Sequence, residues 1–164
     1  MLVLSVDPGV TSGWCVYNST AKRVLEAGAF PDFQLHVPGW PGSVDAIAIE
    51  RPKGQGPTRP AMVDCGYVAG RLVERLSALF GLPVVELYRY EIRKRLADLT
   101  HGAVPVRNDA GVWAALVLLH GEGSDVKATT KREAGAIGLC TGHARAALAV
   151  AVVAADRMAK ETAP

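Results

Sequence analysis

The first third of the chain is a series of short apolar runs separated by turn residues, which predicts strands. Leu2–Val6 is rich in Val and Leu, as expected for a buried strand. Residues 7–9 (Asp-Pro-Gly) form a turn signal, and a second apolar segment, Thr11–Tyr17, starts almost at once. These two segments predict a β-hairpin. Arg23–Phe30 alternates well enough to be a third strand at the edge of the sheet.

A second buried strand also ends in a carboxylate. Asp45–Ile49 is a short apolar run that is followed by Glu50 and closed by Pro52. The first strand ends in the same way, at Asp7. An unpaired carboxylate is costly to bury, and Asp-Pro-Gly also forms turns without any further role, so Asp7 alone is ambiguous. Two strands of one sheet that both end in an acid favour a shared functional site.

The remainder of the chain changes to helical periodicity. Glycine, asparagine and threonine mark the ends and caps of these segments. The expected elements are a helix at Ala61–Phe80, a strand at Pro83–Tyr88, a short basic helix at Tyr90–Leu99, a helix from the Asn108 cap to Gly121, and a final helix from Gly142, capped by Thr141, to about Lys160. Strands followed by alternating strands and helices predict one α/β domain over residues 1–164 with a mixed sheet.

Composition is that of an ordinary soluble domain and excludes several classes. The chain has 164 residues, 49% hydrophobic and 21% charged, with a net charge of +2. Its three cysteines are far apart and form no Cys-x-x-Cys pair, so we expect neither a disulfide framework nor a zinc site, and we expect a reducing compartment. The longest apolar run, Ala146–Ala155, is about half as long as a membrane span, and we expect no secretory signal, because Asp7 interrupts the first apolar run early.

A histidine near the start of the last helix supplies a partner for the two acids. We expect His143 to lie in the first turn of that helix, near the edge of the sheet where the strands end. If the helix packs across the first strand, His143 can face Asp7 and Glu50. Carboxylates and imidazole are ligands suited to Mg²⁺ or Mn²⁺, so these three residues are candidate metal ligands.

Three motifs resemble those of the RuvC-type Holliday-junction resolvases, which belong to the RNase H-like nuclease superfamily. They are Leu4-Ser5-Val6-Asp7-Pro8-Gly9 with Gly13-Trp14 behind it, Ala48-Ile49-Glu50-Arg51-Pro52, and His143-x-x-Ala146-Ala147-Leu148-Ala149-Val150-Ala151. The resemblance implies an RNase H-like (RuvC-like) mixed five-stranded sheet flanked by helices. It also implies two divalent ions, Mg²⁺ or Mn²⁺, with Asp7 bridging both, Glu50 holding one and His143 serving the other, for the hydrolysis of a phosphodiester bond.

The chain departs from that family at one catalytic position. The family usually has a fourth acid three residues after the position of His143, on the same helix face, and this chain has Ala146 there. Three explanations are open: an engineered inactive form, a lineage that works with three ligands and water, or a natural branched-DNA binder that has lost cleavage. The sequence does not distinguish between them.

Basic residues flank the acidic motifs and are candidate phosphate contacts. The residues that we expect beside the acidic pocket to bind DNA are Arg51, Lys53, Arg59, Lys127, Lys131, Arg132 and Arg145. A further cluster on the short helix, Arg89, Arg93, Lys94 and Arg95, is expected on a different face.

The function implied is a metal-dependent, structure-selective endodeoxyribonuclease that resolves Holliday junctions (four-way junctions) or other branched DNA in recombination and repair. By the resemblance, it would act in the cytoplasm of a bacterium or as a phage-encoded enzyme, as a homodimer that uses the helix at Ala61–Phe80 as its interface, without a membrane partner. The alternatives are a non-cleaving branched-DNA binding protein and a RuvX/YqgF-type RNase H-like nuclease acting on RNA. The RNA nuclease predicts further acidic motifs in the middle of the chain, which are not found.

Overall fold

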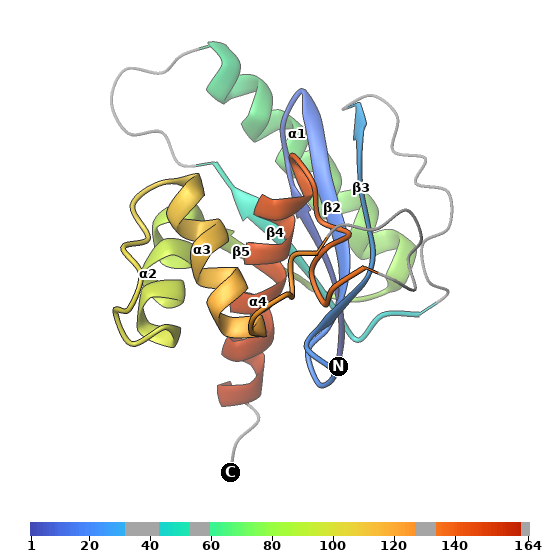
Figure 1. Cartoon of the computed structure of the whole chain (residues 1–164). Coiled ribbons are helices and arrows are strands. Elements are labelled where there is room, and N and C mark those ends of the chain that lie inside the picture. The colour runs from blue at the N-terminus through green and yellow to red at the C-terminus, as the bar shows by residue number, and fades with distance from the viewer. Residues whose placement is uncertain (32–42, 53–59, 127–133, 162–164) are drawn as a thin grey trace.

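The computed structural model describes residues 1–31, 43–52, 60–126 and 134–161, with the side chains of residues 60–62 excepted. Its elements occur in the order β1 (Leu2–Asp7), β2 (Thr11–Asn18), β3 (Arg23–Pro31), β4 (Ala46–Arg51), α1 (Pro60–Phe80), β5 (Val84–Tyr88), α2 (Arg89–Leu99), α3 (Asp109–His120) and α4 (Ala144–Glu161). The strands form one five-stranded sheet in the order β3-β2-β1-β4-β5 (Figure 1). This mixed sheet flanked by helices is the architecture that the sequence predicts.

The sheet combines a hairpin half with a parallel half. β1, β2 and β3 pair antiparallel, whereas β4 lies parallel to β1, and β5 lies parallel to β4. Parallel neighbours end at the same edge of a sheet, so β1, β4 and β5 all finish on one side. The last residues that β1 and β4 pair are Val6 and Ile49. Asp7 and Glu50 follow these two residues directly.

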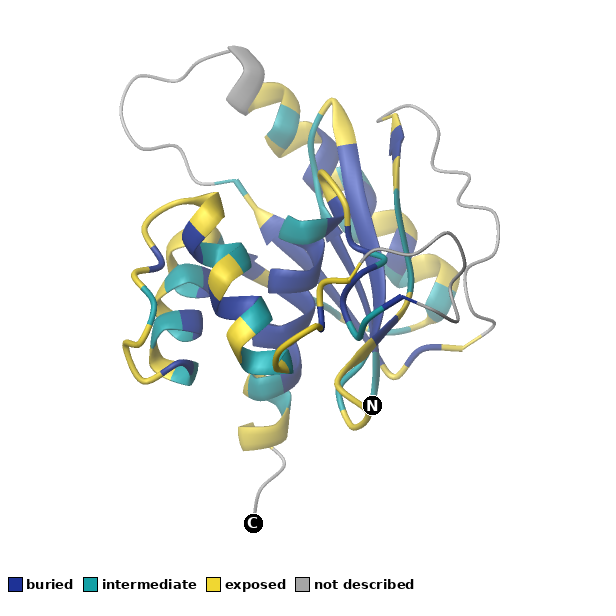
Figure 2. Cartoon of the chain, in the orientation of Figure 1, coloured by how far each residue is buried: buried dark blue, intermediate teal, exposed yellow. Residues whose placement is uncertain are grey.

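Strand alternation decides which face of the sheet each acid occupies. Leu4, Val6, Ile47 and Ile49 point to one face and pack with Val68, Ala69, Leu72 and Leu76 of α1. Val3, Ala46 and Ala48 point to the other face and pack with α2, α3 and α4. Because successive side chains point to opposite faces, Asp7 and Glu50 share the α4 face with Val3, Ser5, Ala46 and Ala48. Figure 2 shows the buried residues concentrated in the sheet and in the inner surfaces of the helices.

The final helix lies close against the sheet because the residues between them are small. The middle of α4, from Ala147 to Ala155, is buried throughout, so this helix packs against neighbours on more than one side. The hydroxyl of Ser5 donates a hydrogen bond to the carbonyl oxygen of Ala147 at 2.7 Å. At Gly13, a Cβ atom would lie 2.2 Å from the carbonyl oxygen of His143, so no side chain fits there. Ser5 and Gly13 together allow α4 to begin beside the end of β1.

The start of α4 differs from the prediction. The helix begins at Ala144, and His143 lies in the turn before it, not in its first turn. The carbonyl of Thr141 accepts a hydrogen bond from the backbone N–H of Ala144 at 3.1 Å, which closes that turn. Gly142 has a φ of 51°, a backbone conformation that favours glycine and interrupts regular helix. The expected start at Gly142 with a Thr141 cap is therefore wrong by two residues.

Two further findings concern disulfide bonds and membrane-spanning helices. Cys15, Cys65 and Cys140 form no disulfide with one another. Among the described residues, no helix combines the length and the apolar character that crossing a membrane requires.

Candidate functional site

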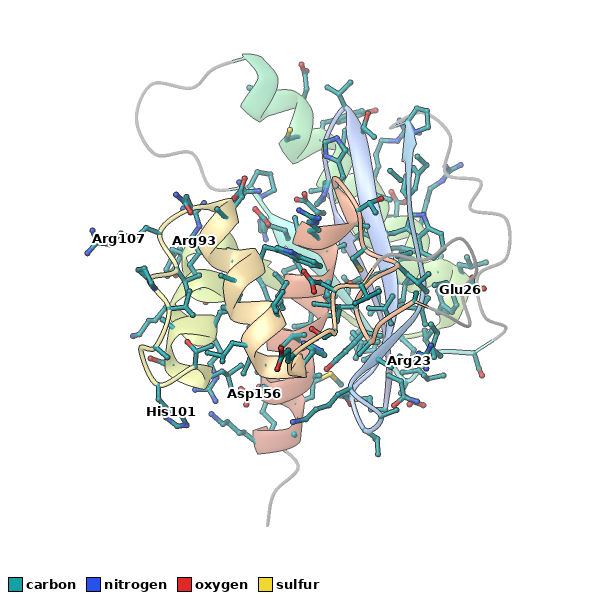
Figure 3. The ribbon with its side chains drawn as sticks, viewed as in Figure 1. Arg23, Glu26, Arg93, His101, Arg107 and Asp156 are labelled. Atoms are coloured by element: carbon teal, nitrogen blue, oxygen red, sulfur yellow. The ribbon has the colours of Figure 1, made fainter. Side chains whose placement is uncertain are left out.

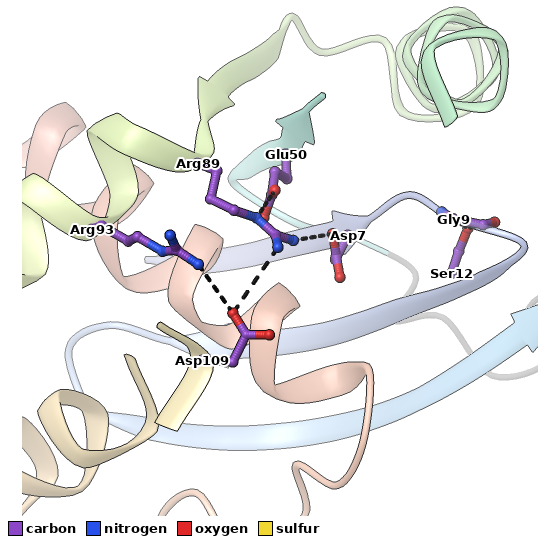
Figure 4. Close-up of polar contacts among 7 residues, drawn as sticks. All are labelled: Asp7, Gly9, Ser12, Glu50, Arg89, Arg93 and Asp109. Carbon is purple, nitrogen blue, oxygen red and sulfur yellow. Dashed lines mark hydrogen bonds and ion pairs between the residues drawn. The ribbon is translucent and has the colours of Figure 1, made fainter. Parts of the chain in front are cut away.

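Asp7 and Glu50 converge in one pocket at the end of the parallel strands. Their side chains are 14% and 10% exposed, so both carboxylates are largely withdrawn from water. The turn after Asp7 is held by Ser12, whose hydroxyl donates to the carbonyl oxygen of Gly9 and accepts from its N–H, both at 3.3 Å (Figure 4). The register of the sheet and the alternation of side chains along its strands therefore bring Asp7 and Glu50 together, as the sequence predicts.

A guanidinium lies between these carboxylates. Nε of Arg89 donates to Oε1 of Glu50 at 2.6 Å, and its Nη2 lies 3.9 Å from Oδ1 of Asp7 (Figure 4). Arg89 is the first residue of α2, directly after β5. Since β5 runs parallel to β4 and pairs Leu87 with Glu50, the chain after β5 reaches the same edge of the sheet as the two acids.

A third carboxylate, Asp109, approaches the same guanidinium from α3. Nη1 of Arg89 lies 4.0 Å from Oδ1 of Asp109, and Nη2 of Arg93 lies 3.3 Å from the same oxygen. Asp109 is in the first turn of α3, whose N-cap residue Asn108 accepts a hydrogen bond from the N–H of Gly111 at 2.9 Å. Its side chain is 86% exposed, in contrast to the two strand-end acids.

The charges in the pocket act on one another strongly. Burial, followed by the negative charge of Glu50, raises the pKa of Asp7 to about 7; Arg89 opposes this shift and Asp109 adds to it. Burial lowers the pKa of Arg89, but its hydrogen bond to Glu50 and the charges of Glu50, Asp7 and Asp109 outweigh burial and raise it. Arg89 therefore carries its charge at every relevant pH, and it is the cation that the buried acids share.

Ala146 lies beside this cluster. It lines a small cavity of about 20 Å³, enough for about one water molecule, together with Glu50, Arg89 and Asp109. Position 146 therefore lies near the acids, although His143, from which the i, i+3 spacing was counted, precedes the helix. At position 146, α4 contributes only a methyl group to this cavity, and no charge.

The backbone of His143 lies near the pocket, whereas its side chain does not contact the two acids. Its carbonyl oxygen lies against Gly13, which pairs with Asp7 across the hairpin. Its side chain is exposed, and no described residue forms a hydrogen bond or ion pair with it. The assignment of His143 as a metal ligand stays a prediction.

The residues that could hold a metal ion are carboxylates, which are the ligands that Mg²⁺ and Mn²⁺ prefer. Within the described residues, no group of three or more His, Cys, Asp or Glu side chains lies close enough to hold an ion. Asp7 and Glu50 are the pair on which a site would be built. The pair of ions stays a prediction.

Of the residues predicted to bind DNA, two are described. Nη1 of Arg51 pairs with Oε2 of Glu86 at 2.9 Å, at the surface. The guanidinium of Arg145 stacks over the ring of Trp113 at 4.2 Å, and its Nε donates to the carbonyl of Cys140 at 3.4 Å. Arg145 therefore braces the turn before α4. The other five, Lys53, Arg59, Lys127, Lys131 and Arg132, lie outside the described residues.

Sequence reasoning missed the two residues that shape the pocket most. Arg89 was expected on a different face as part of a basic cluster, and that expectation is wrong because Arg89 points into the pocket. The signal for Arg89 was its place directly after a third parallel strand. Asp109 follows a recognised N-cap, but an exposed acid in a first helical turn is common and carries no signal of its own.

Two solved structures of RuvC have the same fold as this chain. The chain is similar to RuvC from Thermus thermophilus, with a TM-score of 0.64 and 19% identity over 99% of this chain and 98% of that one. It is also similar to T. thermophilus RuvC in complex with a Holliday junction substrate, with a TM-score of 0.58 and 17% identity over 96% of each chain. No protein-family model and no curated protein matches the sequence. The resemblance to RuvC that the motifs predict is thus confirmed at the level of the whole fold.

Proposed function

We propose that this RuvC-like fold is a metal-dependent endonuclease that cuts four-way junctions or other branched DNA. One observation carries the proposal: Asp7 and Glu50 end neighbouring parallel strands and converge in one buried pocket, in a chain that matches RuvC over nearly its whole length. The T. thermophilus RuvC with the same fold is in complex with a Holliday junction substrate, which supports branched DNA as the class of substrate.

The chemistry of the pocket fits a divalent cation. Two largely buried carboxylates converge there, and burial, followed by the charge of Glu50, raises the pKa of Asp7, so a bound cation would favour its ionised form. The Arg89 guanidinium already lies at that point as a stand-in for a cation. Asp7 and Glu50 would hold the ion, Mg²⁺ or Mn²⁺, with water and His143 as further candidate ligands. When bound, such an ion activates water and stabilises the leaving oxygen in phosphodiester hydrolysis.

The chain's own residues prepare the pocket for this chemistry. The register of β1 and β4 holds Asp7 and Glu50 side by side, and burial under α4 excludes bulk water from around them. A low effective dielectric strengthens every charge interaction there. The hairpin turn held by Ser12 fixes the position of Asp7 with respect to β2.

Exposed arginines near the pocket are candidate phosphate contacts. Arg51 lies at the end of β4 beside Glu50, and Arg107 projects outward from the segment between α2 and α3 (Figure 3). Each residue of this kind that neutralises a phosphate makes binding weaker as the salt concentration rises.

A labelled four-way junction tests the proposal directly. The junction is incubated with the unchanged chain, with Ala146→Asp and with Asp7→Asn, in Mg²⁺ and in Mn²⁺, and an unbranched duplex is the control substrate. We expect cutting of the junction by at least one of the first two proteins and none by Asp7→Asn. Cutting by Ala146→Asp alone would mean that the fourth acid is required, and cutting by both would mean that it is not.

A second candidate function is branched-DNA binding without cleavage. Ala146 and the ion pairs of Arg89 favour it, because the pocket lacks an acid on α4 and its buried carboxylates already have a cation. In the same experiment, junction binding without cutting by any variant in either metal would establish this function in place of the nuclease. A structured RNA as a third substrate covers the RNA-nuclease alternative.

We also propose that the protein is a homodimer, which would bring two pockets to the two strands of a junction. The outer side of α1 supports this, because Val63 and Tyr67 lie about one helical turn apart there and are 58% and 67% exposed. Large apolar side chains exposed on one helix are typical of an interaction surface.

A further inference from the structure

Arg89 occupies the position where a cation would bind, and this has a consequence for how the pocket would take up an ion. We infer that Arg89 is an internal counter-ion that a divalent cation must displace, and that Asp109 holds its side chain after displacement. This inference rests on the proposed function, because it concerns the same carboxylates.

The geometry makes the two cations mutually exclusive. Nε of Arg89 is 2.6 Å from Oε1 of Glu50, which is a close, charge-assisted hydrogen bond. Its Nη2 also lies 3.9 Å from Oδ1 of Asp7. An ion bound between Asp7 and Glu50 would need the same carboxylate oxygens and would repel the guanidinium.

Asp109 offers a second position for the displaced side chain. The Arg89 side chain is half exposed, so it lies at the mouth of the pocket and is free to move outward. Nη1 of Arg89 is already 4.0 Å from Oδ1 of Asp109, so a small rotation away from Glu50 would turn this contact into a close ion pair. Arg93 contacts the same oxygen at 3.3 Å and helps to hold Asp109 in place.

Asp109 itself has a firm base for this role. The N-cap bond from the N–H of Gly111 to Asn108 fixes the first turn of α3. At Gly111 a Cβ would lie 2.3 Å from the carbonyl oxygen of Pro105, so the turn packs tightly on the segment before it. Asp109 is therefore a positioning residue for Arg89, anchored on an element different from the strands that carry the acids.

The test measures Mn²⁺ binding by titration calorimetry at pH 8 on the folded protein, independently of cleavage. Arg89→Met removes the internal cation and keeps the length of the side chain. We expect its affinity for Mn²⁺ to rise about tenfold or more over that of the unchanged chain. The control is Arg95→Met on the same helix, whose guanidinium pairs with Asp156 at 2.6 Å, and we expect it to leave the affinity unchanged.

Asp109→Asn provides a second measurement, because its exposed side chain makes misfolding a minor concern. We expect this variant to bind Mn²⁺ several-fold more weakly, since Arg89 loses its second position. In the Arg89→Met background the same change should cost clearly less affinity, because only the direct attraction between the Asp109 charge and the ion is then lost. An equal loss of affinity in both backgrounds would overturn the role assigned to Asp109.

The outcomes separate this inference from the proposed function. Equal Mn²⁺ affinity for Arg89→Met and the unchanged chain, with junction cutting intact, would overturn the inference and leave the nuclease standing. If no variant binds Mn²⁺ and none cuts, both the metal-dependent nuclease and the displacement of Arg89 are overturned. Should Arg89→Met fail to fold, an unchanged affinity in Asp109→Asn alone overturns the inference.

Discussion

Replacing Asp7 by Asn should make the protein more stable at neutral and alkaline pH. Burial and the charge of Glu50 raise the pKa of Asp7 from its ordinary value of 3.8 to about 7 in the folded state. Below about pH 4 the carboxyl is protonated in both the folded and the unfolded state, so its ionisation does not change the free energy of unfolding. Between about pH 4 and pH 7 only the unfolded state releases the proton, so the free energy of unfolding falls as the pH rises.

The size of the effect follows from the same two pKa values. Above pH 7 the full penalty applies, and it amounts to at most about 4 kcal/mol for the shift from 3.8 to about 7. Asn is nearly isosteric with Asp and carries no charge. Asp7→Asn should therefore raise the free energy of unfolding by on the order of 2–4 kcal/mol at pH 8 and hardly change it at pH 4. The side chain is 14% exposed, so solvent screening reduces this figure only in part.

Urea unfolding at pH 4, 6 and 8, without divalent cations, measures the effect. The control is Asp64→Asn, which removes an exposed acid from the outer side of α1 and should leave the pH profile unchanged. A stability gain for Asp7→Asn that is the same at all three pH values would refute the reasoning, because it would show that the gain does not come from ionisation. A loss at pH 8 would show that the carboxylate is stabilised by Arg89 more than it is penalised by burial.

Three further predictions concern packing and assembly. Gly13→Ser should lower the free energy of unfolding by about 3 kcal/mol or more, because its Cβ would overlap the backbone before α4. The control is Gly66→Ala on α1. No described neighbour outside the helix's own backbone lies within 4 Å of the added Cβ there, so the free energy of unfolding should rise by about 0.5–1 kcal/mol. Arg145→Gln should lower stability by about 1 kcal/mol through loss of the contact with Trp113, and an unchanged melting temperature would count against that contact. Tyr67→Asp should turn a dimer into a monomer in light scattering, and an unchanged mass would exclude the outer side of α1 as the interface.

One cause explains both effects that we predict for Asp7→Asn. These effects are a gain in stability and a loss of junction cutting. A pocket that concentrates negative charge is ready to bind a cation and is costly to fold without one. Arg89 offsets part of this cost in the absence of a metal ion. The same ion pairs would then oppose metal uptake, which links the stability of the fold to the proposed activity.

The strands and the place of the two buried acids follow from local pattern along the chain. Short apolar runs that end in Asp7 and Glu50 are a local pattern, and the two-residue alternation of a strand then assigns both side chains to one face. Helical spacing also fixes which residues share a side of α4, but it does not place His143, which precedes the helix. These features depend only on neighbours along the chain.

The tertiary structure decided which charges share the pocket. Arg89 and Asp109 belong to α2 and α3, and their meeting with Glu50 depends on how those helices pack beside the end of the sheet. Exposed charged residues have no periodic signal that places them, so local pattern could not predict this meeting. The turn that places His143 before α4 likewise follows from the close approach of the backbone to Gly13, a contact between segments 130 residues apart.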